Sequence, residues 1–260
     1  MGKKRNRLRL EFTEEFDDRS SKRSKKQRSK TFYADKPQSD NDLKLRVNAL
    51  NETQGQLLAQ MVSNTITFGI GPAGTGKTML STCKACELLH DKKVDKIILT
   101  RPIIEIGRTI GHLPGDVNEK YEPYLAPFKQ YFIDCFGKSG YEARLNKTII
   151  PIPINFLQGH TWDDSIILLD EAQNMSVQEM FMFLTRIGKN SKAFITGDIK
   201  QTATTGLKSQ NGLKHFLDNF GGKEIFLHGD IGVVEFTSED VVRSDIVGRI
   251  IKFYDTVDLV

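Results

Sequence analysis

The feature that most constrains the fold of this chain is the octapeptide Gly71-Pro-Ala-Gly-Thr-Gly-Lys-Thr78. An apolar run at 66–70 precedes it, and residues 79–90 behind it have the character of a helix. The three glycines let the backbone turn tightly and aim its N–H groups at one point, where the helix N-terminus adds the positive end of its dipole. This order of strand, loop and helix predicts a phosphate-binding loop.

The spacing inside the loop also assigns roles to its last two residues. The Lys77 ammonium is expected to reach the β- and γ-phosphates of a nucleotide, and the Thr78 hydroxyl to bind Mg²⁺. An ordinary glycine-rich turn is the alternative, but the strand and helix on either side favour the phosphate loop. The predicted nucleotide contacts are Gly71, Pro72, Ala73, Gly74, Thr75, Gly76, Lys77, Thr78 and Met79.

A second motif, at 165–174, is a short apolar run that ends in two acids, Asp170 and Glu171. Such a run is typical of a parallel strand buried on both faces, whose carboxyl end faces the ligand side of the sheet. Asp170 is therefore expected to hold Mg²⁺, and Glu171 to polarise the attacking water. Alternatively, the two acids begin a solvated helix. Ser176 and Glu179 predict a capping box for a helix over 177–187.

Two further strands are predicted to end at the same edge. The strand at 193–197 leads to Gln201, which could hydrogen-bond the γ-phosphate or the attacking water. The strand at 96–100 brings Arg101, which could contact an anion or form a structural ion pair. With Glu171, Asp170 and Lys77, Gln201 completes the predicted catalytic set. Thr148 and Ile149 follow Asn146-Lys147, with no Asp to read guanine, so ATP is the expected nucleotide.

The charge of the chain is concentrated in residues 1–30, which hold 12 Lys/Arg and 5 Asp/Glu. Residues 1–42 are polar, so we expect a disordered basic arm followed by one α/β domain at 43–260. Such an arm can bind RNA or single-stranded nucleic acid by releasing counterions, or it can be a solvated tail. Three cysteines suit a reducing compartment. The chain has no run of about 18 apolar residues, so we expect no membrane segment.

An insertion at about 103–160 separates two of the predicted strands. Its residues 149–156 indicate strand pieces broken by prolines, as at a sheet edge. Five aromatic residues in its middle follow helical spacing and are expected to pack in a core, although bases could stack on any that are exposed: Tyr121, Tyr124, Phe128, Tyr131 and Phe132. Pro123 and Pro127 argue against one uninterrupted helix.

Several strings together resemble the PhoH family of ATPases: IILTRPIIEIGRTIGHLPGDVNEKYEPYLAPF, GIGPAGTGKT, LLDEAQN, MFLTRIG, TGDIKQ and DVVRS. The resemblance covers about 48–254 and implies a three-layer RecA-like P-loop core with a mainly parallel sheet, related to superfamily 1 helicases. It places Gln54 where an adenine-reading glutamine would stand, although Gln54 could instead be the capping partner of Asn51. It also implies a homo-oligomeric ring such as a hexamer, in which Arg186 or Arg243 completes a neighbour's site. Either arginine could instead form a structural ion pair or serve its own subunit's phosphates.

The chain departs from the family pattern at Gln158-Gly-His160, at Arg108 and in the segment after Gln201. These departures concern coupling to a polymer or a neighbour rather than ATP binding. The sequence therefore predicts a Mg²⁺-dependent, helicase-like ATPase that binds or remodels RNA or single-stranded nucleic acid. The alternative is a nucleotide switch or assembly ATPase that acts on a protein partner. Its expected location is the cytoplasm, or the host cytoplasm if a phage encodes it.

Overall fold

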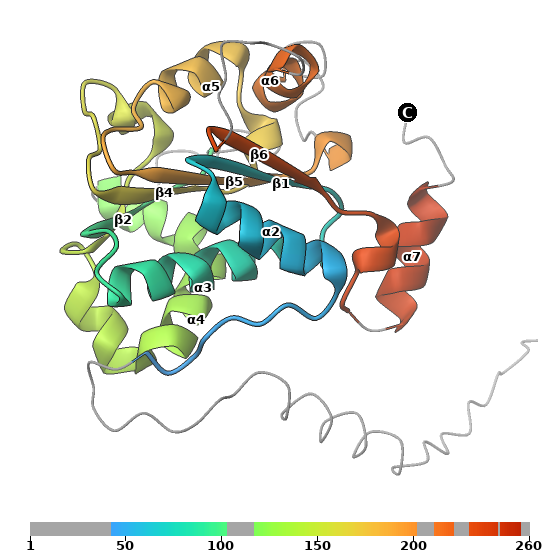
Figure 1. The fold of residues 1–260 in the computed structure, drawn as a ribbon, viewed down its shortest axis with the longest axis horizontal. Coiled ribbons are helices and arrows are strands. Elements are labelled where there is room, and N and C mark those ends of the chain that lie inside the picture. Colours follow the sequence, from blue (N-terminus) through green and yellow to red (C-terminus); the bar gives the residue numbers. More distant parts are fainter. Residues whose placement is uncertain (1–42, 103–116, 202–210, 221–228, 244, 256–260) are drawn as a thin grey trace, which may run out of the picture. The chain divides into compact units, whose positions relative to one another are not determined.

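The computed structural model describes residues 43–102, 117–201, 211–220, 229–243 and 245–255 (Figure 1). Three expectations fall outside these residues. They are the basic arm at 1–42, the departure at Arg108, and the divergent segment after Gln201 as far as residue 210.

A parallel sheet, six-stranded within the described residues, lies at the centre of the fold (Figure 1). The strand order is β3-β2-β4-β5-β1-β6, and every neighbouring pair is parallel. All residues of β4 are buried, as expected for a strand covered on both faces. The strands are β1 (Ile66–Ile70), β2 (Lys96–Thr100), β3 (Ile149–Pro151), β4 (Ser165–Leu169), β5 (Lys192–Gly197) and β6 (Ile231–Glu235).

Helices cover both faces of this sheet and make three layers (Figure 1). On one face lie α2 (Glu52–Ser63) and α3 (Lys77–His90), with α4 (Val117–Arg144) packed against α3. On the other face α5 (Val177–Leu184) packs against α6 (Gly212–Phe220). The expected three-layer α/β class with a parallel sheet is therefore confirmed.

Short 3-10 helices follow four of the strands. η2 (Ala172–Asn174) comes after β4, η3 (Ile199–Gln201) after β5, and η5 (Ser238–Asp240) after β6. η1 (Ile154–Leu157) follows β3, and α7 (Asp245–Asp255) packs against η5. The site described below is built largely from these strand ends, because parallel strands deliver their carboxyl ends to one edge.

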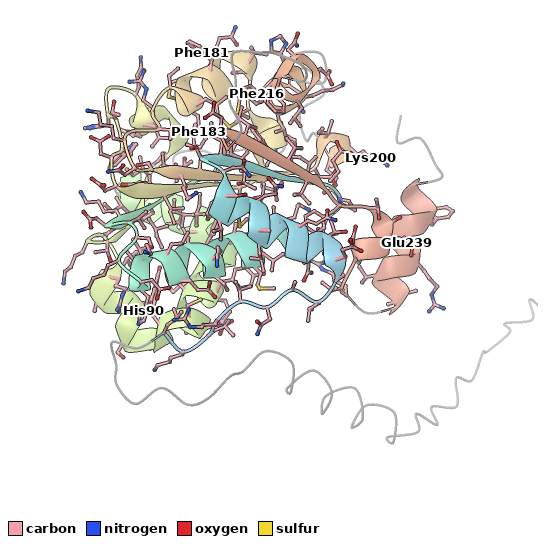
Figure 2. The ribbon with its side chains drawn as sticks, viewed as in Figure 1. His90, Phe181, Phe183, Lys200, Phe216 and Glu239 are labelled. Carbon is pink, nitrogen blue, oxygen red and sulfur yellow. The ribbon has the colours of Figure 1, made fainter. Side chains whose placement is uncertain are left out.

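The face under α5 and α6 is closed by aromatic side chains (Figure 2). Phe183 is fully buried, and the Phe216 ring stacks on Phe68 of β1 with centroids 5.2 Å apart. Phe181 points away from the sheet and is 70% exposed. Ser176 and Glu179 form the predicted capping box at the start of α5, but the helix ends at Leu184 rather than at residue 187.

The part of the insertion that the structure describes includes a long helical element and an edge strand. α4 continues through Pro123 and Pro127, and its break lies at Gly137, where φ is 73°. The helix is therefore interrupted, as expected, but the break lies at Gly137 and not at the prolines, because Gly137 adopts a positive φ that a residue with a side chain disfavours. Phe128 and Phe132 are buried as predicted, and Phe136 is buried as well. β3 pairs only with β2 in the described sheet, as predicted for an edge.

Residues 43–50 run along α3 and α4 before α2 begins. The Lys44 N–H donates to the Cys135 carbonyl of α4 at 2.6 Å, and the Val47 N–H donates to Glu87 Oε1 of α3 at 2.7 Å. Leu45 between them is buried. These contacts attach the start of the domain to both helices. None of the described helices is both long and apolar enough to cross a membrane.

Candidate active site

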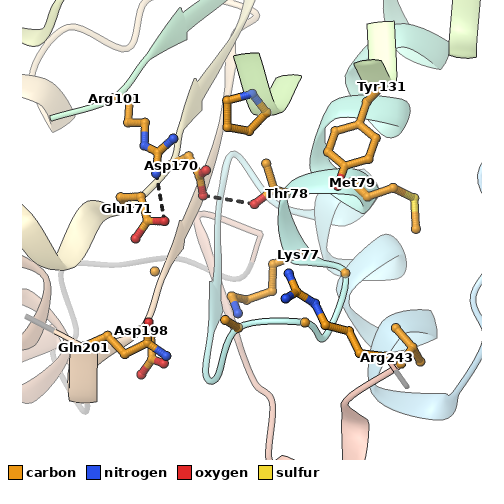
Figure 3. A pocket seen from close by; sticks show the side chains of 16 residues that line it. Lys77, Thr78, Met79, Arg101, Tyr131, Asp170, Glu171, Asp198, Gln201 and Arg243 are labelled. Atoms are coloured by element: carbon orange, nitrogen blue, oxygen red, sulfur yellow. Dashed lines mark hydrogen bonds and ion pairs between the residues drawn. The ribbon is translucent and has the colours of Figure 1, made fainter. Parts of the chain in front are cut away.

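A cavity of about 390 Å³ opens at the carboxyl ends of the strands (Figure 3). The loop after β1, the ends of β2, β4 and β5, the helix α4 and the segment after η5 all contribute to its wall. Its lining residues are Ala73, Gly74, Gly76, Lys77, Thr78, Met79, Arg101, Pro127, Tyr131, Asp170, Glu171, Gly197, Asp198, Gln201, Val242 and Arg243.

The loop after β1 has the shape that its glycines predict. Gly71 and Gly76 have φ of 138° and 88°, in the region that side chains disfavour. A Cβ on Gly71 would lie 2.3 Å from the Phe236 carbonyl oxygen, so no larger residue fits there. Gly76 ends the loop, and α3 begins at Lys77 with its N-terminal residues lining the cavity. An anion at this end of α3 would meet both free N–H groups and the positive end of the helix dipole.

Lys77 lies beneath the loop and is largely buried. Its Nζ donates to the carbonyl oxygens of Gly71 and Pro72, each at 2.7 Å, and to Thr75 Oγ1 at 3.2 Å. Burial lowers the pKa of the Lys77 ammonium, while the Asp198, Asp170 and Glu171 carboxylates act in the opposite direction. These carboxylates favour the charged form in which the ammonium can attract phosphate.

Thr78 and Asp170 come from different elements and meet across the cavity floor (Figure 3). Thr78 Oγ1 donates to Asp170 Oδ1 at 3.1 Å, and Thr196 Oγ1 donates to the same oxygen at 2.6 Å. Burial raises the pKa of Asp170, although the Thr196 hydrogen bond opposes that rise.

This pair of oxygen ligands fits one kind of metal ion. Mg²⁺ prefers hard oxygen donors and usually keeps several waters beside one or two carboxylates and substrate phosphates. Thr78 and Asp170 supply such donors next to the phosphate loop. No group of three or more His, Cys, Asp or Glu suited to a metal occurs within the described ranges, so an all-protein cage is not formed there.

Glu171 follows Asp170 and is held from two sides. Arg101 Nη2 of the β2 end lies 3.0 Å from Glu171 Oε1, and Gln173 Nε2 of η2 donates to Glu171 Oε2 at 2.5 Å. Glu171 has φ of 57° and ψ of 37°, a left-handed conformation that is uncommon for a residue with a side chain. The ion pair is partly exposed, with Arg101 at 20% and Glu171 at 35%.

The end of β5 supplies Asp198 and Gln201. Asp198 is buried, and this burial raises the pKa of its carboxyl group. Gln201 is exposed on η3 and lines the cavity, and its N–H donates to the Asp198 carbonyl at 3.0 Å. The residues that line this one cavity include Lys77, Thr78, Asp170, Glu171 and Gln201.

Gln54 lies behind the phosphate loop rather than in the cavity wall. Its side chain is fully buried, its Nε2 donates to the Thr75 carbonyl at 3.0 Å, and its Oε1 accepts from the Leu50 N–H at 2.8 Å. Asn51 Oδ1 also accepts from the Gln54 N–H, as an N-cap does. In this geometry Gln54 joins α2 to the loop.

The two arginines named as candidates for a neighbour's site lie in different places. Arg243 lines the cavity beside its own phosphate loop, where a Cβ on Gly74 would lie 2.9 Å from Arg243 Cδ. The neighbouring Val242 N–H donates to the Gly74 carbonyl at 3.0 Å. Arg186 comes after the end of α5 and does not line the cavity.

Three polar residues in or beside the cavity were not assigned to the site from the sequence. Asp198 could have been found, because it directly follows an apolar run as Asp170 does. Tyr131 was expected in the core but lines the cavity, and no spacing rule separates these two outcomes. Gln173 is buried in η2, and its contact with Glu171 depends on the shape of that turn.

Comparisons with known proteins agree on one family. The family model described as PhoH-like protein matches residues 46–255. A PhoH-like protein of Bacillus subtilis (strain 168) is 42% identical over 205 residues, which cover 78% of this chain and 62% of that protein. Protein PhoH of Escherichia coli (strain K12) is 37% identical over 210 residues, covering 79% and 57%. This chain thus spans less than two thirds of either relative's length.

Among solved structures, the Pif1 helicase from Candida albicans aligns with a TM-score of 0.36 and 15% sequence identity. The alignment covers 74% of this chain and 41% of the helicase.

Proposed function

This chain belongs to the PhoH-like family, and from that membership we propose that it is an ATPase that cleaves the β–γ phosphoanhydride bond of ATP with Mg²⁺. One observation carries the proposal. Thr78 of the phosphate loop contacts Asp170 across the cavity floor, with Lys77 on one side and Glu171 on the other. This arrangement supports the binding of a nucleotide's phosphates and a metal ion beside a carboxylate that can activate water.

The chemistry of each side chain in the cavity suggests its role in the proposed reaction. The loop N–H groups and the start of α3 hold the phosphates, and Lys77 neutralises their charge. Thr78 and Asp170 would hold Mg²⁺, which would neutralise the charge that develops on the phosphate oxygens. Glu171 accepts the proton of the attacking water, and Gln201 orients that water or contacts the γ-phosphate.

For the arginines, the geometry supports a role within one subunit more than a role in trans. Arg243 lies against the loop of its own chain, where it can reach the same phosphates. A homo-oligomeric ring, such as a hexamer, remains part of the proposal. In that ring Arg186 is the remaining candidate for contact with a neighbour's nucleotide.

The proposed macromolecular partner is RNA or another single-stranded nucleic acid. ATP hydrolysis is coupled to the binding or remodelling of this partner. The support is the charge of residues 1–30, whose 12 basic and 5 acidic side chains suit phosphate backbones. The proposed location is the cytoplasm, of a host if a phage encodes the chain. Cys83, Cys86 and Cys135 are free thiols in the structure, which suits a reducing compartment.

A protein partner is the second candidate, and one observation favours it. An apolar cavity of about 510 Å³ lies between α5 and α6, and the exposed Phe181 forms part of its wall. Exposed apolar surface of this kind often marks a protein-binding site. In this alternative, nucleotide turnover would drive assembly or switching of the partner.

The test is ATP hydrolysis measured alone and with single-stranded RNA, single-stranded DNA or duplexes, with particle size recorded in parallel. Stimulation by single strands that weakens as salt rises supports the nucleic-acid coupling. If the protein hydrolyses ATP but neither binds nucleic acid nor is stimulated by it, the protein partner is favoured. Absence of Mg²⁺-dependent hydrolysis in every condition would overturn the ATPase itself.

A further inference from the structure

Gln173 is a buried amide that the proposed reaction does not yet use. It is the middle residue of η2 and only 1% exposed. Its Nε2 donates to Glu171 Oε2, and its Oε1 accepts the Asp198 backbone N–H at 3.0 Å. The side chain therefore links the carboxylate that follows β4 to the backbone that follows β5.

The end of β5 is shaped to admit this side chain. A Cβ on Gly197 would lie 2.9 Å from Gln173 Oε1 and 2.8 Å from Leu213 Cδ2. Any larger residue at this position would press on the amide oxygen and push it away from the next N–H. Burying an amide without partners is unfavourable, but here the amide has one partner at each end.

Glu171 needs such support because of its own conformation. Its backbone is left-handed, with φ of 57°, and a residue in this region persists only where its surroundings hold it there. Arg101 restrains one carboxylate oxygen and Gln173 the other, from β2 and η2 respectively. Two restraints fix the direction of the carboxylate, whereas Arg101 alone leaves it free to turn about one contact.

We propose that Gln173 is a positioning residue, which aims the Glu171 carboxylate at the attacking water by anchoring it to the end of β5. The inference rests on the proposed ATPase, since it concerns the same carboxylate. Gln173 does not line the cavity, so it acts only through Glu171. Because Gln173 bonds to the end of β5, this strand end positions both the Glu171 carboxylate and Gln201, which lies three residues beyond Asp198.

The first experiment compares Gln173→Met, which keeps the length of the side chain but removes both hydrogen bonds, with the wild type. We expect kcat to fall by about 100-fold, as for a misplaced reacting group, while KM and the affinity for ATP stay within about twofold. The matched control is Gln60→Met on α2. Gln60 Oε1 accepts a hydrogen bond from Asn64, and Gln60 does not line the cavity. Its kcat should match that of the wild type.

A double-mutant cycle with Glu171→Gln, measured at single turnover, separates positioning from general structural support. If Gln173 acts through Glu171, adding Gln173→Met to Glu171→Gln lowers the residual rate by less than about twofold. A further loss as large as that of Gln173→Met alone would overturn the proposal. So would a Gln173→Met enzyme with unchanged kcat, or one whose loss is confined to KM.

A second variant covers the case in which Gln173→Met does not fold. Gln173→Glu keeps an acceptor for the Asp198 N–H but turns an acceptor instead of a donor toward Glu171, and it should show the same loss of kcat. Failure of both variants to fold, judged by circular dichroism and thermal melting, would make Gln173 a structural residue and overturn the positioning role. Hydrolysis by the wild type is measured before any variant is compared. An inactive wild type would refute the ATPase itself and not the role of Gln173.

Discussion

At the scale of single residues, Lys77 and Glu171 lie in one cavity but have different surroundings. Lys77 is buried under the phosphate loop, whereas the Glu171 carboxylate is partly exposed at the far wall. Binding and turnover should therefore respond differently to substitution of the two residues.

We expect Lys77→Ala to lose ATP binding and Glu171→Gln to bind ATP but not turn it over. Each hydrogen bond to a charged group is worth about 1.5–3 kcal/mol, and loss of a general base costs about 10²–10⁴ in rate. Equilibrium binding and steady-state hydrolysis measure the two effects. Lys84→Ala on the same helix is the control for Lys77. Full turnover by Glu171→Gln would show that another group activates the water.

We expect substitution of Asp170 to raise the stability of the protein but to lower its activity. Burial raises the pKa of this carboxyl above its usual 3.8, so the charged form destabilises the fold at neutral pH. Asp170→Asn should therefore melt at a higher temperature than the wild type in metal-free buffer at neutral pH, while losing Mg²⁺-dependent hydrolysis.

The sign of the pH dependence follows from the same shift. The loss of stability caused by the charged Asp170 carboxylate is fully present above its raised pKa. It shrinks as pH falls through that pKa and is absent below the usual value of 3.8. Thermal melting across this range should bring the Asp170→Asn and wild-type curves together at acid pH. The exposed Asp218→Asn is the control. A gap that widens on acidification would contradict the assignment.

At the scale of elements, strand ends and helix caps were predictable because they depend on neighbours in sequence. The loop at 71–78, the acids after β4 and the capping box of Ser176 each follow from short patterns. The position of the break in α4 was not predictable from its prolines, because the helix continues through both of them as far as Gly137. The contact between Gln173 and Glu171 depends on η2, and the surroundings of Tyr131 on tertiary packing, so spacing alone could not give either.

The capping box supplies a test at this scale. Ser176 Oγ accepts from the Glu179 N–H at 3.2 Å, and the Ser176 N–H donates to Glu179 Oε2 at 2.8 Å. Ser176→Ala should lower the free energy of unfolding by about 1 kcal/mol in urea titrations. Ser63→Ala at the exposed end of α2 should change it by less than about 0.5 kcal/mol. Equal effects of the two substitutions would mean that the cap contributes little to the stability of α5.

At the scale of the whole molecule, the distribution of charge separates the arm from the domain. Residues 1–30 hold 12 basic and 5 acidic side chains, in a chain whose formal net charge is only +4. The domain contacts described above begin at Lys44.

Deletion of residues 1–40 should leave the domain folded and its basal ATPase unchanged, because the contacts of Lys44 and Val47 are retained. It should weaken RNA binding, most strongly at low salt, since counterion release provides that affinity. Binding titrations at two salt concentrations measure the effect. Equal RNA affinity with and without the arm would rule out its electrostatic role.

A subunit-mixing experiment decides whether Arg243 serves its own phosphates or a neighbour's. Arg243 lies against its own phosphate loop, so we expect Arg243→Ala and Glu171→Gln each to be inactive and their mixture to stay inactive. Co-assembly is checked by differently tagged subunits. Recovery of activity in mixed particles would show that Arg243 acts across a subunit boundary.

The attachment of residues 43–50 to α3 and α4 has a mechanical consequence. A load on the arm would enter the domain at the backbone of Lys44 and Val47, through one hydrogen bond to each helix. One of these helices begins at Lys77, and the other carries Tyr131 on the cavity wall. Tension on a nucleic acid held by the arm would therefore reach α3 and α4, on two sides of the cavity, before it reached the sheet.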